Sequence, residues 1–224
     1  MKKLRILALV HDHLVPPDDV TGIDVLEAEW KMEYDVIETL RERGHDVRVL
    51  GIHDDLAGIR PTAGFFEPHI VLNLMEAFAG VTTFDQNVVS YLELLRLPYT
   101  GCNPRGLILA RDKGLSKQLL AYHRIPVPNF FVVRPGRKAA LPKRLGYPLI
   151  VKSLFFEASA GISQASVVEN DEQLARRVQF IHDNLGTAAI VEQFIDGREL
   201  YVGVLGNERL EVFPVWEMSF ASMP

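Results

Sequence analysis

The sequence predicts an α/β protein in which a domain with a layered parallel sheet, residues 1–100, precedes an α+β module, residues 101–224. Three observations lead to this prediction. Apolar runs alternate with amphipathic segments over the first hundred residues, which is typical of a parallel sheet layered by helices. Short apolar segments with few helices between them follow, which favours antiparallel pairing. The composition, 48% hydrophobic and 24% charged, is that of a globular protein with a substantial core.

The first domain begins with a strand. Residues 6–10 form a continuous apolar run, as expected of a strand covered on both faces of a parallel sheet. Residues 25–43 carry apolar side chains at spacings of three and four, which predicts an amphipathic helix that ends at Gly44. The other elements expected in this domain are strands at residues 46–52 and 69–75 and a helix at residues 84–96.

The second module is richer in strands. The prolines of residues 125–128 end a helical stretch and enforce an extended backbone. A helix at residues 171–184 has Asp171 as its expected N-cap, and Asp196-Gly197 is a hairpin signal. The other elements expected here are helices at residues 105–111 and 113–123 and strands at residues 130–134, 148–153, 165–168, 188–194, 199–205 and 210–215.

Charge and composition exclude several classes of protein. A formal net charge of -5 argues against nucleic acid or an anionic membrane surface as a partner. The single cysteine, Cys102, allows no intramolecular disulfide and fits a cytoplasmic protein. No apolar run approaches the roughly 18 residues needed to cross a bilayer. The glycine fingerprint of dinucleotide enzymes and the Gly-x-Ser-x-Gly elbow of serine hydrolases are both missing, which disfavours these two functions.

Residues 147–163 carry the most informative pattern. Lys152 ends an apolar strand, where an unpaired ammonium is costly, so this side chain requires an anion. The small-residue loop that follows, with Ser159 and Gly161, could bring backbone N–H groups and a hydroxyl to phosphate oxygens. A lysine that extends its charged end to solvent, beside an ordinary hairpin turn, explains the same residues equally well.

Two further segments carry charged residues in unusual places. Lys113 stands at the start of a helix, where the dipole disfavours a cation, and sharing a phosphate with Lys152 would explain it. Taken alone, it is more often part of a solvated helix face. Glu192 and Glu199 flank the turn after a strand, and in isolation they are acids at a sheet edge. These alternatives stay open on the residues alone.

Five short motifs follow one another along nearly the whole chain. They are the Pro-Tyr-Thr-Gly junction at residues 98–101, the Asp-Lys-x-x-x-Lys segment at 112–117, Ile-Pro-Val-Pro at 125–128, the lysine strand and glycine-rich loop at 151–162, and the segment from Val-Glu-Gln-Phe-Ile to Gly-Arg-Glu at 191–199. In this order and spacing they resemble the ATP-grasp superfamily, most closely its D-alanine:D-alanine ligase-like branch. The resemblance implies a Rossmann-like pre-ATP-grasp domain followed by the first lobe of an ATP-grasp fold.

The resemblance implies a role for each matching residue. Lys113 and Lys152 would contact nucleotide phosphates, and the loop at residues 157–161 would close over them. Adenine would lie against residues 192–195, mainly against their backbone, and Glu199 would take the ribose hydroxyls. The ATP-binding residues implied in this way are Lys113, Lys152, Glu157, Ser159, Gly161, Glu192, Gln193, Phe194, Ile195 and Glu199.

The reaction implied by the resemblance is ATP-dependent ligation of a carboxylate to an amine. The carboxylate attacks the γ-phosphate of ATP, and the amine then displaces the acyl-phosphate. Catalysis would rest on positioning and charge neutralisation rather than on a protein nucleophile. The expected cofactors are ATP and Mg²⁺, the expected partners an unidentified carboxylate and amine, and a homodimer is expected because relatives are often dimers. The alternative is a non-catalytic ATP- or ADP-binding or interaction module.

Substrate candidates come from the first domain. Glu76 lies at the carboxyl end of an expected parallel strand, where open α/β sheets place ligands, although a surface acid is an equal alternative. Its segment departs from the His-Gly pattern of authentic D-alanine ligases, which weakens D-alanine as the substrate. His11 and Asp12 follow the first strand at the same edge. His11 and His13 have no evident third ligand, so no metal site is expected in this chain.

The magnesium ligands of the family lie downstream of the adenine-binding segment, on a second lobe. No Glu-x-Asn pattern follows Glu199, so we expect these ligands outside residues 1–224 and interpret the chain as a truncated ligase. Without such carboxylates, the Mg²⁺ that bridges phosphate oxygens has no protein clamp. We therefore expect little or no ligase turnover from these 224 residues alone.

Overall fold

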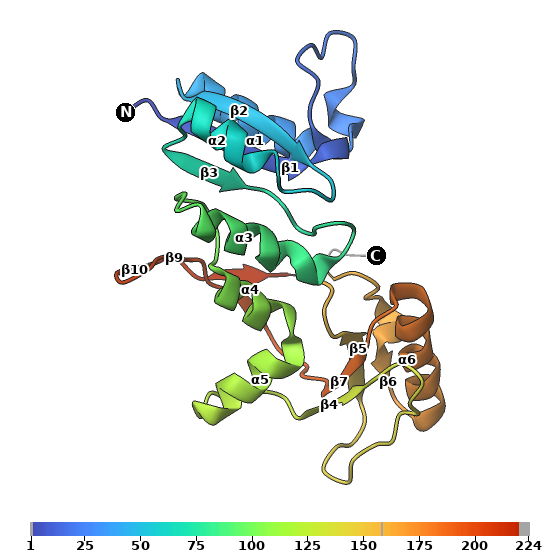
Figure 1. Ribbon diagram of the computed structural model, residues 1–224. Helices are drawn as coiled ribbons and strands as arrows, with labels where there is room; N and C mark the ends of the chain where they lie inside the picture. Colours follow the sequence, from blue (N-terminus) through green and yellow to red (C-terminus); the bar gives the residue numbers. More distant parts are fainter. Residues whose placement is uncertain (1, 158, 220–224) are drawn as a thin grey trace.

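The computed structural model describes residues 2–157 and 159–219 and has a mixed α/β fold (Figure 1). The elements of its first half are β1 (Arg5–His11), α1 (Lys31–Glu42), β2 (Asp46–Ile52), α2 (Ile59–Phe66), β3 (Ile70–Asn73), α3 (Asp85–Leu94), α4 (Pro104–Arg111) and α5 (Lys113–Tyr122). The second half contains β4 (Phe130–Val133), β5 (Leu149–Ser153), β6 (Val167–Val168), α6 (Asp171–Leu185), β7 (Ala189–Gln193), β8 (Glu199–Tyr201), β9 (Val204–Gly206), β10 (Leu210–Val212) and β11 (Trp216–Met218).

A three-stranded parallel sheet of order β2-β1-β3 organises the N-terminal half. The side chains of the central strand from Leu7 to Val10 are fully buried, which confirms the prediction of a strand covered on both faces. One face packs against Ile37 of α1, and the other packs against α2 and α3. Because the strands are parallel, the residues after β1 and β3 emerge at the same edge of the sheet.

Two N-terminal helices differ from the prediction. The helix expected at residues 25–43 is a 3₁₀ turn at Val25–Glu27 followed by α1, which begins only at Lys31. Helix α2 was not expected, because Pro61 and Gly64 are usually helix breakers. Pro61 is accommodated since it lies in the first turn, where a backbone N–H has no partner within the helix. The buried side chains of α2 are Ile59, Ala63 and Phe66.

A four-stranded antiparallel sheet of order β4-β7-β5-β6 organises the second half. Helix α6 covers one face of it with apolar side chains that include Leu174 and Ile181. The N-cap of α6 is Asn170, whose side chain accepts a hydrogen bond from the backbone N–H of Gln173, so the expectation of Asp171 as the cap was wrong. Asn170 takes this role because it alone has the extended backbone that places a side-chain oxygen over the first turn.

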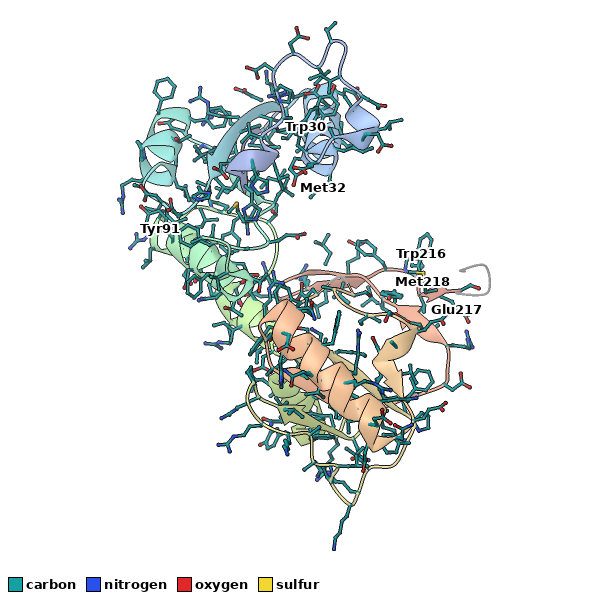
Figure 2. The ribbon with its side chains drawn as sticks, turned by 90° about the vertical axis from the view of Figure 1, so that its right-hand side faces the viewer. Trp30, Met32, Tyr91, Trp216, Glu217 and Met218 are labelled. Carbon is teal, nitrogen blue, oxygen red and sulfur yellow. The ribbon has the colours of Figure 1, made fainter. Side chains whose placement is uncertain are left out.

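The hairpin expected at Asp196-Gly197 is not formed. β7 pairs with β4 on one side and β5 on the other, so neither edge of it remains for β8. β8 pairs instead with β11, and β9 pairs with β10, both antiparallel. The strand expected at residues 199–205 is broken into β8 and β9, and the one expected at residues 210–215 is shortened to β10. Figure 2 shows Trp216 and Met218 of β11 lying clear of α6, and the Trp216 side chain is 71% exposed.

Helices α3, α4 and α5 connect the two sheets (Figure 1). Asn103 caps α4 with its side chain and is followed by Pro104, a residue well suited to the first helical position. Asp112 interrupts the helical path and caps α5, accepting a hydrogen bond from the backbone N–H of Leu115. This break places Arg111 and Lys113, on either side of Asp112, near the junction of the two halves.

None of the helices described is long and apolar enough to cross a membrane.

We expect the core between α3 and the parallel sheet to control the stability of the N-terminal half. Leu92 is 0% exposed and Leu94, on the same helix, is 79% exposed. Leu92→Ala should lower the free energy of unfolding by about 2–5 kcal/mol, because it leaves a cavity, whereas Leu94→Ala should change it by less than about 0.5 kcal/mol. Urea unfolding monitored by circular dichroism measures both. Equal effects of the two substitutions would show that α3 does not pack as described.

Candidate functional site

A cavity of about 520 Å³ opens at the carboxyl-terminal edge of the parallel sheet. The three substrate candidates from the sequence, His11, Asp12 and Glu76, all line it, so the structure brings them together. The other lining residues are His13, His53, Ala77, Gly80, Thr82, Arg111, Phe156 and Glu157. The cavity therefore joins the sheet edge to the beginning of the glycine-rich loop.

Histidines and acids interact within this cavity. Oδ1 of Asp12 lies 3.3 Å from Nδ1 of His53 and 3.5 Å from Nδ1 of His13. The rings of His11 and His13 are 5.6 Å apart. Burial lowers the pKa of His11, the nearby His13 lowers it further, and the carboxylate of Glu76 opposes both effects. Over the described parts of the chain, no group of three or more potential ligands is arranged to hold a metal ion.

Lys113 is held at the start of α5 by backbone oxygens. Its Nζ donates to the carbonyl of Phe156 at 2.6 Å and to that of Leu154 at 3.5 Å. Burial lowers the pKa of this lysine, and Glu157 partly compensates. Lys152 lies close enough to lower the pKa of Lys113 further, so the two lysines predicted to share a phosphate are neighbours. Their contact with phosphate stays a prediction.

Lys152 already has an anionic partner within the chain. Its Nζ lies 3.4 Å from Oε2 of Glu192, on the adjacent strand β7. Lys152 thus has the anionic partner that the sequence led us to expect, and this partner is Glu192. Binding of phosphate by Lys152 therefore does not follow from the need for an anion and stays a prediction. Sequence reasoning missed this pairing because Lys152 and Glu192 are 40 residues apart in the chain and meet only through the register that places Ile150 opposite Glu192.

Lys117 is a functional candidate that the sequence reasoning did not single out. Its Nζ lies 3.5 Å from Oε1 of Glu192, so the nearly buried carboxylate bridges two lysines. Lys117 is one helical turn after Lys113, and the i,i+4 spacing on α5 could have indicated that both reach the same region. The group of Lys113, Lys117 and Lys152 around one buried glutamate has a net positive charge and is suited to attract an anion.

The glycine-rich loop is anchored at its far end to α6. Arg177 donates to the carbonyl of Gly161 and, at 2.8 Å, to Oγ of Ser166. Gly161 has φ +70°, a backbone conformation that favours glycine, and a Cβ on it would lie 2.9 Å from Cδ1 of Leu185, which would have to shift. Ser159 also has a positive φ of 58°, which is uncommon for a residue with a side chain. Of the described residues of this loop, Ser159 and Gly161 thus both adopt a left-handed backbone conformation.

The segment expected to bind adenine leaves the sheet at the end of β7. The N–H of Gln193 donates to Asn129 at 2.9 Å, and the N–H of Phe194 donates to Pro148 at 3.2 Å. The backbone N–H groups of Gln193 and Phe194 are therefore already hydrogen-bonded, and any contact of these residues with adenine has to involve their other atoms. The next residue, Ile195, is exposed. Glu199 begins β8 and accepts a hydrogen bond from Tyr201, and no contact recorded for the described residues joins it to the lysines.

Comparison with known proteins gives several D-alanine–D-alanine ligases among the relatives. Residues 119–223 match the family model described as D-ala D-ala ligase C-terminus. The chain is 40% identical over 184 residues to a D-alanine–D-alanine ligase of Syntrophotalea carbinolica, covering 80% of this chain and 55% of that protein. It is 32% identical over 190 residues to the corresponding ligase of Desulforudis audaxviator, covering 84% and 59%. The chain thus spans little more than half the length of these curated relatives.

Solved structures share the fold. The D-alanine–D-alanine ligase of Bacillus anthracis complexed with ATP aligns with a TM-score of 0.70 and 17% identity, covering 98% of this chain and 67% of that one. The ligase of Coxiella burnetii aligns with a TM-score of 0.66 and 20% identity, covering 96% and 71%. At such identities the likeness concerns the fold. Joined with the sequence relatives and the matched family model, it supports a D-alanine ligase-like ATP-grasp protein.

Proposed function

We propose that this protein acts in the ATP-dependent joining of a carboxylate to an amine through an acyl-phosphate. The observation that carries the proposal is the group of Lys113, Lys117 and Lys152 beside the glycine-rich loop, in a chain related in sequence to D-alanine–D-alanine ligases. In the same proposal, residues 1–100 form the pre-ATP-grasp domain and residues 101–224 the first ATP-grasp lobe. The single cysteine, Cys102, is exposed and free, which suits a cytoplasmic setting.

The proposed nucleotide position follows from charge. Triphosphate oxygens would lie against Lys113 and Lys152, which neutralise the charge that develops during phosphoryl transfer. Lys152 would then share its charge between phosphate and Glu192, while Lys117 keeps that buried carboxylate paired. The loop at residues 157–163 would cover the phosphates and exclude water, adenine would contact residues 192–195, and Glu199 would bind the ribose.

Mg²⁺ enters the proposal as the ion that accompanies ATP. The donor set of the described residues does not suit it, because Glu192, the buried acid nearest the lysines, is already paired with two of them and no cluster of three potential ligands is present there. We therefore assign no residue of this chain to the metal and derive no step through it.

The cavity at the sheet edge is the proposed substrate site. Three carboxylates, those of Asp12, Glu76 and Glu157, line it, and the guanidinium of Arg111 in its wall is paired with both Asp85 and Glu157. An acid-lined cavity of this kind favours a substrate that carries a protonated amine. A homodimer remains part of the proposal, and light scattering of the purified protein tests it.

Nucleotide binding is the first test. Lys152→Ala should weaken the binding of ADP by about tenfold or more, which corresponds to about 1.4 kcal/mol, because one of the phosphate-neutralising charges is lost. Isothermal titration calorimetry measures the affinity, and Lys143→Ala, on an exposed loop, serves as the control that should leave it unchanged. Absence of ADP binding to the unmodified chain, or equal affinities for all three proteins, would contradict the proposed site.

Ligation by the 224 residues alone is the second test. With ATP, Mg²⁺ and a mixture of amino acids, we expect ATP binding but little or no release of phosphate. The Syntrophotalea carbinolica ligase, assayed in parallel, verifies the conditions. A turnover number near the median for enzymes, about 10 per second, would overturn this prediction. Binding without turnover, even when the remaining length of a relative is supplied as a fusion, would favour a non-catalytic nucleotide-binding module.

The electrostatics of the cavity give the third test. The pKa of His11 should lie below the ordinary value of about 6.5, and Glu76→Gln should lower it further by removing a carboxylate that favours the imidazolium. As the pH falls, His11 becomes protonated in the unfolded chain before it does so in the folded protein. Its contribution to the free energy of unfolding therefore decreases as the pH drops below about 6.5. NMR titration of the histidine ring protons measures the pKa, with Glu169→Gln as control. An unchanged pKa in Glu76→Gln would show that the two side chains do not share the cavity.

A further inference from the structure

The guanidinium of Arg111 contacts three separate segments of the chain. Its Nε and one terminal nitrogen donate to Oδ2 of Asp85 at 2.9 and 2.7 Å. The same terminal nitrogen donates to the backbone carbonyl of Glu76 at 2.8 Å, and the other lies 3.2 Å from Oε2 of Glu157. Arg111 thus joins α4, α3, the wall of the substrate cavity and the start of the glycine-rich loop.

The pair with Asp85 is the fixed end of this arrangement. The Arg111 and Asp85 side chains are only 12% and 3% exposed. Separating them would leave a buried carboxylate without its cation, which is costly. Two hydrogen bonds to one carboxylate oxygen also restrict the plane of the guanidinium. The orientation of Arg111 is therefore set by the N-terminal half of the molecule.

The contact with Glu157 is the exchangeable end. The Glu157 side chain is 49% exposed, so water can replace the guanidinium at modest cost. Glu157 also begins the turn of the loop, because its carbonyl accepts the N–H of Ala160 at 3.0 Å. The preceding residue, Phe156, provides the carbonyl that holds Lys113. A displacement of Glu157 would therefore change the loop and the surroundings of Lys113 together.

Only an arginine can make this set of contacts. Three of its five N–H groups donate hydrogen bonds, and the second terminal nitrogen forms the ion pair with Glu157; the planar guanidinium fixes the directions of these contacts. A lysine in the same place could neutralise Asp85 with its single ammonium group, but it could not reach Glu76 and Glu157 in the same geometry. Arg111→Lys thus keeps the positive charge at residue 111 and removes the simultaneous contacts with Glu76 and Glu157.

We propose that Arg111 is a positioning residue that ties the glycine-rich loop, through Glu157, to the wall of the substrate cavity at Glu76. The part that this contact plays in catalysis rests on the proposed function, in which Arg111 aligns the loop that covers the nucleotide with the substrate cavity. Since one side chain serves both, occupancy of either site would influence the other, and this influence is reciprocal. The tether itself exists without any nucleotide.

Hydrogen–deuterium exchange of the nucleotide-free protein tests the tether. In Glu157→Gln and in Arg111→Lys, the amides of residues 159–163 should exchange about three- to fivefold faster than in the unmodified chain, the range expected for loss of a half-exposed ion pair. The double variant should be no faster than Arg111→Lys alone, because both substitutions break the same contact. Amides of β1 and β5 should be unaffected throughout. Arg105→Lys, on the exposed side of α4, and Glu169→Gln are the matched controls.

The outcomes separate a positioning role from a purely structural one. If Arg111 only stabilised the fold by neutralising Asp85, Arg111→Lys, which keeps the positive charge, and Glu157→Gln would both leave the exchange of residues 159–163 unchanged. That pattern, or multiplicative effects in the double variant, would overturn the proposal. Slower loop exchange on adding ADP to the unmodified chain tests the proposed nucleotide site instead. The tether and the nucleotide site can therefore fail independently.

Discussion

Buried carboxylates paired with cations hold the candidate site together. Glu192 binds β7 to β5 through Lys152 and to α5 through Lys117. Asp85 binds α3 to the end of α4 through Arg111. Because a buried carboxylate without a cation is costly, each pair fixes the relative position of the elements that carry it. The two lysines and the arginine are thereby ordered before any ligand arrives, which reduces the entropy that binding has to overcome.

The glycine-rich loop depends on both ends of this framework. At its start, Glu157 faces Arg111, and at its end Gly161 is held by Arg177 against α6. These two arginines belong to different halves of the fold, one on a helix between the sheets and one on the helix that covers the antiparallel sheet. The conformation of the loop therefore depends on the relative position of the two halves. A small rotation of one half against the other would strain the loop or break one of its contacts with the two arginines.

Local patterns predicted much of the fold and fewer of the contacts. The strand at β1 and the helix at α6 were predictable because their apolar periodicity agrees with their burial. Helix α2 was not, because propensity alone cannot show that Pro61 falls in a tolerant first turn. The candidate site residues were proposed from motifs and from the ends of strands, and their partners within the chain were missed. The pairing of Lys152 with Glu192 follows from strand register, and that of Arg111 with Asp85 from helix packing, which local sequence does not encode.

The placement of the two tryptophans gives the molecule a pair of built-in optical probes. Trp30 precedes α1 and stacks edge-on with Tyr34, 5.7 Å between ring centres, whereas Trp216 is exposed on β11 in the other half (Figure 2). Excitation energy can pass from Tyr34 to Trp30, and the solvated indole of Trp216 emits at longer wavelength. In Trp216→Phe, the tryptophan fluorescence would come only from Trp30 and follow the half that contains the parallel sheet. In Trp30→Phe, it would come only from Trp216 and follow β11 and its partner β8. The cooperativity of the two halves is thus accessible to fluorescence without an added label.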